Sequence, residues 1–232
     1  MKIKSCRHFN TTKTQKWLQM VVIGTVVATS MPIHVEARDS RDSIALYTAA
    51  IGGLYGVGES LVNGNDPIKG CWDGFMTGSM LPGAILGGGI GLGVGFLVNS
   101  SMFTPMTEKS WVGWGAGGAA IGSLLSTHSV ASTLERQMDM PFPILSTGLF
   151  AYYAVAASEG YRFSQMANTE FPGDAMRHNK VSGKLRNHFD PGLALTAGAL
   201  KESHDYFFQA GSPEFRDLQN NWEGIFRGVH SY

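Results

Sequence analysis

The chain has 232 residues, of which 18 are Lys or Arg and 18 are Asp or Glu, so its formal net charge is zero. It therefore has no basic excess of the kind that nucleic-acid binding requires. Its two cysteines are too few for a disulfide-stapled scaffold, and the length suits one or two domains.

Residues 1–37 have the three parts of a secretory signal peptide. The first sixteen residues contain five Lys or Arg and no acid, and the next fifteen are almost entirely apolar. The sequence VEA at residues 35–37 offers small residues for cleavage before Arg38. Cleavage would leave 13 basic and 17 acidic residues, a net charge of −4, with Cys71 as the single thiol. The segment predicts export to the periplasm or the membrane of the cell envelope; an uncleaved anchor is the alternative.

Residues 38–158 form a glycine-rich region that is almost uncharged. Nine Asp, Glu, Lys or Arg fall in residues 43–158, against seventeen in residues 159–232, which places a domain boundary near residue 159. The region contains uncharged runs of 15, 25, 24 and 19 residues. About 20 apolar residues cross a hydrocarbon core, and a backbone in lipid must satisfy its own hydrogen bonds. The longer runs therefore predict membrane-inserted helices.

Glycines recur every fourth residue within these runs, which places them along one face of a helix. Without side chains there, a neighbouring helix can approach closely. The expected packing positions are Gly83, Gly87, Gly91, Gly95, Gly113 and Gly117. We therefore expect an all-α fold in which a glycine-zipper hairpin or three-helix group precedes a smaller helical domain. The glycine faces also offer a surface for pairing with a second copy, and a soluble helical core is the alternative.

Residues 159–232 have the pattern of a small domain of amphipathic helices. Pro172-Gly173 is a break after which Asp174 can cap a helix, and Asp190-Pro191 begins a helix that continues to residue 208. Ser212-Pro213 is the expected start of the last helix, with a hydroxyl at the cap and proline at the first position. Three helical segments are therefore predicted.

The last two helices are joined by a short connection at residues 209–211 and should pack antiparallel. At equal distances from this turn lie Asp205 and Asp217, Glu202 and Asn220 or Asn221, and Gly198 and Glu223 or Gly224. Carboxylates that converge inside a helical pair must be paired, protonated or bound to a cation. This convergence makes the pair of helices the candidate functional site.

Three roles are open for this group of side chains. The first is a polar network that fixes helix register, with Lys201 and Arg216 pairing the carboxylates; its members are Asp174, Lys201, Asp205, Asp217, Asn220 and Asn221. The second is a divalent cation, Ca²⁺ or Mg²⁺ held by oxygens or Zn²⁺ with a histidine added. The third is acid–base catalysis, with Glu202 as base and His178 or His204 as partner. No H-E-x-x-H motif selects among them.

The order of residues in this half resembles YfiM-type periplasmic proteins and, more distantly, VanZ-like membrane proteins. The matching pattern runs Asp174, His178, His188-Phe189, Gly198, Lys201-Glu202, Asp205, Asp217, Asn221 and Gly224. The resemblance covers about 50 residues and implies a small helical envelope protein whose acidic and amide residues face one another. The chain lacks the lipid-attachment cysteine of the lipoprotein members, and the resemblance implies no particular reaction.

Three functions follow as hypotheses. The first is an exported, membrane-associated envelope protein with a structural or assembly role. The second is a membrane-associated hydrolase of lipid or cell-wall material that uses the C-terminal acids and a histidine. The third is a pore-forming protein built on the glycine-rich runs. An open cleft lined by the carboxylates would favour the hydrolase, and carboxylates sealed against basic side chains would favour the first function.

Overall fold

The computed structural model describes residues 40–227, and this part of the chain forms seven helices and no strand. The helices are α2 (Ser40–Asn63), α3 (Pro67–Ser101), α4 (Glu108–Gln137), α5 (Ile144–Glu170), α6 (Asp174–His188), α7 (Pro191–Phe208) and α8 (Phe215–Phe226). The all-α prediction is therefore confirmed for the described residues. The predicted signal peptide at residues 1–37 lies outside them.

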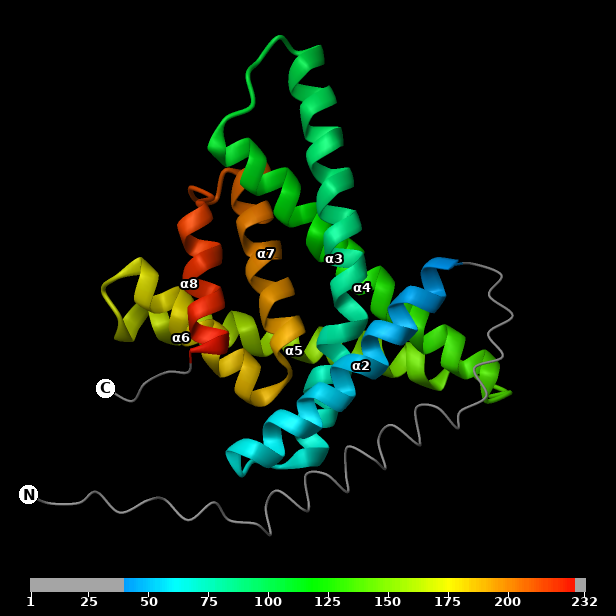
Figure 1. Ribbon diagram of the computed structural model, residues 1–232. Helices are drawn as coiled ribbons and strands as arrows, with labels where there is room; N and C mark the ends of the chain where they lie inside the picture. The colour runs from blue at the N-terminus through cyan, green and yellow to red at the C-terminus, as the bar shows by residue number, and fades with distance from the viewer. Residues whose placement is uncertain (1–39, 228–232) are drawn as a thin grey trace, which may run out of the picture.

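The helices are arranged around α3, α4 and α7 (Figure 1). The long helix α3 packs against α2 near its beginning and against α4 along its later turns. On its other side α4 contacts α7, while α8 packs against both α6 and α7. Helix α5 contacts α4, α6 and α7. The predicted domain boundary near residue 159 falls inside α5, which continues without a break.

Capping side chains explain where several helices begin. The Asp66 carboxylate accepts a hydrogen bond from the Ile68 amide at 2.8 Å, with Pro67 at the first helical position of α3. Asp190 does the same for α7, accepting from the Leu193 amide at 2.8 Å, and the helix begins at Pro191, where the sequence predicted its start. The predicted cap of α6 at Asp174 is wrong by one residue, because the cap position is Gly173 and Asp174 is the first helical residue.

The predicted start of the last helix at Ser212-Pro213 is wrong, because α8 begins at Phe215. Gln209 at the end of α7 has a left-handed conformation with φ of 52°, which turns the chain out of the helix. Glu214 is extended, and its amide donates to the Glu202 carboxylate at 3.2 Å instead of entering a helix. A side chain distant in sequence thus satisfies this amide, and the connection is longer than expected.

Glycines line the contacts between α2, α3 and α4. A Cβ atom on Gly87 would overlap the carbonyl oxygen of Gly118, and one on Gly83 would overlap that of Gly122. Gly91 and Gly95 of α3 lie in the same way against the backbone and the indole of Trp114. The other predicted packing glycines face α7 instead: Gly113 lies against Tyr206 and Gly117 against Ser203.

Within the described part of the chain, α3 is the one helix long and apolar enough to cross a membrane, so the uncharged runs in α4 and α5 do not qualify as the further spans that the sequence predicted. Only 11% of its most apolar stretch is buried, whereas the core helix of a soluble protein would be mostly buried. Large apolar side chains point outward along it, namely Leu81, Ile85, Leu86, Ile90, Phe96 and Leu97. Lipid, a partner or solvent must therefore cover this surface.

A small apolar core positions the C-terminal helices. Phe163, Leu185, Ala194 and Ile225 come from α5, α6, α7 and α8 and pack together, with Ala194 and Ile225 fully buried. Because each helix contributes one side chain, the core fixes the spacing of all four helices. The polar side chains of α6, α7 and α8 are therefore held on a rigid base.

Candidate functional site

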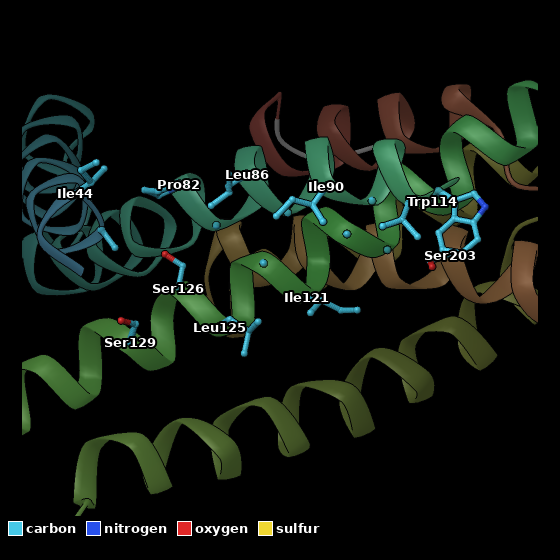
Figure 2. A pocket seen from close by; sticks show the side chains of 18 of the residues that line it. Ile44, Pro82, Leu86, Ile90, Trp114, Ile121, Leu125, Ser126, Ser129 and Ser203 are labelled. Atoms are coloured by element: carbon cyan, nitrogen blue, oxygen red, sulfur yellow. The ribbon is translucent and has the colours of Figure 1, made fainter. Parts of the chain in front are cut away.

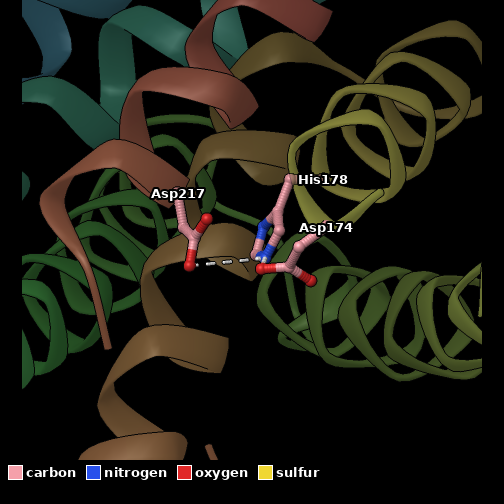
Figure 3. Close-up of side chains that lie close together, drawn as sticks. All are labelled: Asp174, His178 and Asp217. Atoms are coloured by element: carbon pink, nitrogen blue, oxygen red, sulfur yellow. Dashed lines mark ion pairs between the residues drawn. The ribbon is translucent and has the colours of Figure 1, made fainter. Parts of the chain in front are cut away.

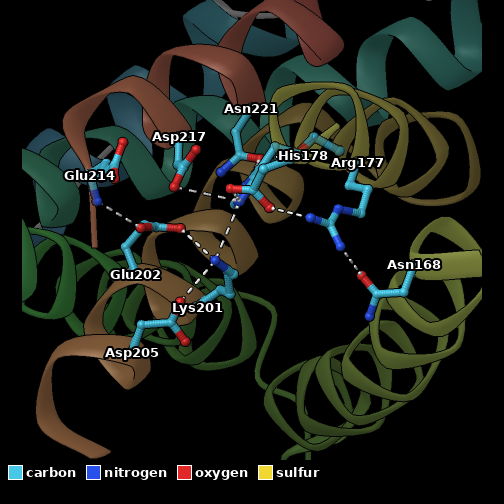
Figure 4. Close-up of polar contacts among 11 residues, drawn as sticks. Asn168, Arg177, His178, Lys201, Glu202, Asp205, Glu214, Asp217 and Asn221 are labelled. Carbon is cyan, nitrogen blue, oxygen red and sulfur yellow. Dashed lines mark hydrogen bonds and ion pairs between the residues drawn. The ribbon is translucent and has the colours of Figure 1, made fainter. Parts of the chain in front are cut away.

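Polar side chains of α6, α7 and α8 converge in one cluster beside this core (Figure 4). Helix α6 contributes one face at intervals of four residues, and α7 and α8 contribute the rest: Asp174, His178, Ser182, Lys201, Glu202, Asp205, Asp217 and Asn221. Six of these are buried, namely His178, Ser182, Glu202, Asp205, Asp217 and Asn221. The cluster is therefore part of the interior rather than a charged surface.

The Lys201 ammonium lies at the centre of the cluster and has three acceptors. It donates to Asp205 Oδ2 at 2.9 Å, to Glu202 Oε1 at 3.2 Å and to His178 Nε2 at 3.3 Å. An ammonium has three N–H groups, so its hydrogen-bonding capacity is filled. The neighbouring carboxylates hold the pKa of Lys201 above its usual value, although burial alone would lower that pKa. Lys201 is therefore charged at neutral pH.

His178 is held in one orientation by Asn221. Its Nδ1 lies 3.2 Å from Asn221 Oδ1, which also accepts a hydrogen bond from Ser182 Oγ at 2.7 Å. Because Oδ1 can only accept, the hydrogen-bond network places the ring proton of His178 on Nδ1, which donates to Asn221. Nε2 is then the unprotonated nitrogen, which accepts from Lys201 and faces the carboxylates of Asp174 and Asp217.

Glu202 is sealed inside the cluster. Its side chain has no exposed surface, and its two oxygens accept from Lys201 and from the Glu214 amide. Burial is the main cause that raises the pKa of Glu202 above its usual value, and the ammonium of Lys201 opposes it. Glu202 therefore exposes no atom to solvent and does not line the pocket beside the cluster.

One end of the cluster opens into a pocket of about 360 Å³ between α5, α6 and α7. Asp174, Arg177, His178, Lys201 and Asn221 line its polar end, whereas Glu202, Asp205 and Asp217 do not reach it. The other walls carry small or apolar side chains, including Ala156, Gly160, Ala167, Val181 and Leu200. His178 is therefore the predicted catalytic candidate that a molecule in the pocket could touch.

Arg177 closes the outer edge of this polar end. Its guanidinium donates to Asn168 Oδ1 at 3.2 Å and lies 3.3 Å from Asp174 Oδ1. The ion pair holds Asp174 beside His178 although the Asp174 side chain is 62% exposed. Arginine at this position thus joins α5 to α6 at the mouth of the pocket.

The structure brings together most of the predicted site residues, but three lie apart. His204 is exposed, stacks on Phe208 and approaches only the outer oxygen of Asp205, at 3.7 Å. Arg216 is exposed and forms no ion pair with the described residues, so Lys201 alone pairs the buried carboxylates of α7. Asn220 forms no hydrogen bond to the cluster within residues 40–227; its buried Nδ2 has no partner there.

The predicted register of α7 against α8 is wrong by about one helical turn. Gly198 lies against Asn221 rather than against Glu223 or Gly224, and a Cβ atom on Gly198 would be 2.5 Å from Asn221 Nδ2. Gly224 instead lies against the backbone of Asn179 in α6. The cause is the longer connection, since α8 begins two residues after the expected proline.

Sequence reasoning missed the roles of Ser182 and Arg177. Ser182 follows His178 by four residues, so the helical repeat alone places both on one face and could have found it. Arg177 could not be found in this way, because its partner Asn168 belongs to a different helix. The same holds for the Glu214 amide, whose role depends on where α8 begins.

A second, larger cavity of about 1010 Å³ lies along α3 and α4 (Figure 2). Glycines form part of its lining, and its walls are apolar side chains of α2, α3, α4 and α7, such as Ile44, Leu86, Ile90, Ile121 and Phe207. Its few polar groups are the hydroxyls of Ser126, Ser129 and Ser203. An apolar cavity of this kind suits hydrocarbon rather than a charged substrate.

Comparison of the chain with known protein families, curated proteins and solved structures gives no match. The resemblance to YfiM-type and VanZ-like proteins therefore stays an expectation drawn from the C-terminal residues. The function has to be argued from the geometry of this chain alone.

Proposed function

We propose that this chain is an exported protein of the cell envelope that associates with a membrane through α3 and has a structural or assembly role. One observation supports this most directly, namely the outward-facing apolar side chains over the length of α3. A helix of 35 residues is long enough to cross a hydrocarbon core of about 30 Å with several turns to spare. In a membrane, lipid would cover these side chains, so no apolar surface of α3 would be exposed to water.

In this proposal the glycines form a zipper that holds α3 to α2 and α4. Helices in lipid lack a hydrophobic driving force toward one another, so close backbone contact replaces it. Gly83 and Gly87 pack within the chain, while Gly89 and Gly93 have no neighbour within 4 Å. Pairing of two copies through a glycine face stays a prediction, and this second face is the one open to it.

The C-terminal helices would then form a rigid polar unit attached to the membrane part. Lys201 fills its hydrogen bonds with groups of α6 and α7, and Glu202 is sealed from solvent. This geometry favours the network role over hydrolysis by Glu202. A partner in the envelope would meet the exposed faces of these helices.

Fractionation of the expressed full-length chain tests the proposal. We expect the protein to stay with membranes through a carbonate wash and to be released by detergent, and the mass of the mature chain to begin at Arg38. Release into the carbonate supernatant would overturn membrane insertion. If the measured mass includes residues 1–37, the segment is not a cleaved signal peptide, and it acts as an uncleaved membrane anchor.

A further inference from the structure

Ligand atoms of Asp174, His178 and Asp217 come together at one point of the cluster (Figure 3). His178 Nε2 lies 3.8 Å from Asp174 Oδ2 and 3.7 Å from Asp217 Oδ2, and one ligand atom from each residue lies within 4.8 Å of the others. Nitrogen and oxygen ligands of Zn²⁺ are about 2.0–2.2 Å from the ion, so tetrahedral ligands lie about 3.5 Å apart. The three ligand atoms would have to move only a little closer to one another to reach that spacing.

The charge around this point is unbalanced. Asp174, Glu202, Asp205 and Asp217 carry four carboxylates, while Arg177 and Lys201 supply two positive charges. Three of the four acids are almost completely buried, where an uncompensated charge is costly. With ionised acids and a neutral His178, one divalent cation would bring the sum to zero.

The hydrogen bonds of His178 are those of a metal ligand. A ligating histidine usually donates its second ring N–H to a fixed acceptor, which orients the ring. Asn221 Oδ1 provides that acceptor at Nδ1, and Ser182 Oγ fixes the amide in turn. Nε2 is thereby left as a lone pair beside the two carboxylates.

Asn221 also supplies an independent sign of a missing group. Its side chain is 3% exposed and directed into the cluster, yet its Nδ2 has no acceptor among the described residues (Figure 4). Gly198 packs closely against this nitrogen, since a Cβ atom on Gly198 would lie 2.5 Å from Nδ2, and the contact provides no acceptor. A buried amide without an acceptor is costly, whereas the oxygen of a metal-bound water would satisfy it.

We propose that Asp174, His178 and Asp217 bind one divalent transition-metal ion of the Zn²⁺ class, with a water molecule in the fourth position that accepts from Asn221 Nδ2. A histidine nitrogen among the ligands selects this class over Ca²⁺ and Mg²⁺, which prefer oxygen alone. Since Asp174 and His178 line the pocket, the water position would be accessible from it. The site is independent of membrane association.

Lys201 is the competitor for this ion, because its Nζ lies 3.3 Å from His178 Nε2. Metal binding would displace that single contact, while the contacts to Glu202 and Asp205 on the same helix can remain. The Lys201 side chain is 47% exposed, which gives it room to move. Replacing Lys201 by Met removes a like charge and should tighten metal binding by at least about tenfold.

The test uses the full chain purified in detergent, stripped with EDTA and dialysed against Zn²⁺ of known free concentration. We expect one Zn²⁺ per chain and a rise in the thermal unfolding temperature on binding. Asp174→Asn should weaken binding by at least about tenfold, and Asn221→Ala by about 10–100-fold through loss of the histidine's orientation. Asp174 is exposed enough for its variant to fold.

His204→Asn is the matched control, since His204 is exposed and lies outside the three-ligand group. It should bind Zn²⁺ as the wild type does. The proposal is overturned if the wild type binds no stoichiometric Zn²⁺, if folded Asp174→Asn and Asp217→Asn bind it unchanged, or if His204→Asn abolishes binding. Tighter binding of Ca²⁺ than of Zn²⁺ would overturn the ion class.

Discussion

Asp190 is a fully buried carboxylate that joins three helices. It caps α7 through the Leu193 amide and accepts a hydrogen bond from the Tyr152 hydroxyl of α5 at 2.8 Å. Next to it, the Gly192 amide donates to Thr77 of α3. Burial raises the pKa of Asp190 to about 6, although the hydrogen bonds from Leu193 and Tyr152 oppose the shift.

The pKa of Asp190 predicts that acidification stabilises this junction. In the unfolded chain the carboxyl has a pKa near 3.8, so the folded state binds its proton more tightly and gains stability as the pH falls through 6. A shift of this size corresponds to at most about 3 kcal/mol. Asp190→Asn keeps a capping side chain and should remove the effect. Thermal unfolding of both proteins from pH 7 to pH 4 measures it; parallel curves would contradict the prediction.

Lys201 supplies the positive charge that pairs with the buried carboxylates of Glu202 and Asp205. Lys201→Met leaves Glu202 and Asp205 without their cation, which we expect to destabilise the fold by about 1–3 kcal/mol, less than for a fully buried pair because Lys201 is half exposed. Glu202→Gln added to Lys201→Met should recover part of the loss. Unfolding in EDTA measures both. A double variant no more stable than Lys201→Met would show that the charge of Glu202 is not the cause.

At the scale of the helix, the close contact between α3 and α4 can be tested with a single methyl group. Gly87→Ala places a Cβ atom on the backbone of Gly118, and since backbone cannot move aside, the helices must separate. We expect a loss of about 1–3 kcal/mol. Gly89→Ala is the matched control, two residues away with nothing within 4 Å of its Cβ. Equal thermal stability of the two variants would contradict the packing role.

The helices themselves were predictable where local chemistry determines them. Asp190-Pro191 marks the start of α7 because a capping carboxylate and a proline both act within one turn. The spacing of Asp174, His178 and Ser182 is likewise local. By contrast, the start of α8 depends on a hydrogen bond from the Glu214 amide to the Glu202 carboxylate, twelve residues earlier in the chain. Such contacts cannot be read from a helical repeat.

The helices against which the glycines pack could not be predicted from the sequence either. Spacing by four residues states that Gly113 and Gly117 share a face, but not which helix lies on it. In the fold that helix is α7, which belongs to the polar half of the chain. Helix pairing therefore depends on the whole molecule and not on the glycine motif.

At the scale of the whole molecule, the open question is what covers α3. Its outward side chains extend over a helix that could cross a bilayer, and the large apolar cavity beside it continues this surface onto α4 and α7. In water such a surface would favour aggregation, whereas in lipid it is the required exterior. A polar substitution on this surface should therefore cost little in water and much more in lipid.

Ile85→Asp distinguishes these environments. Ile85 is 70% exposed near the middle of α3, so in water the change would alter stability by no more than about 0.5 kcal/mol. At the centre of a bilayer an aspartate costs about 3 kcal/mol, so we expect the variant to be lost from the carbonate-resistant membrane fraction. Ile144→Asp, at an exposed position where α5 begins, is the control and should remain in that fraction. If Ile85→Asp stays membrane-bound to the same extent, α3 does not cross the hydrocarbon core, and the apolar surface must instead be covered by a protein partner.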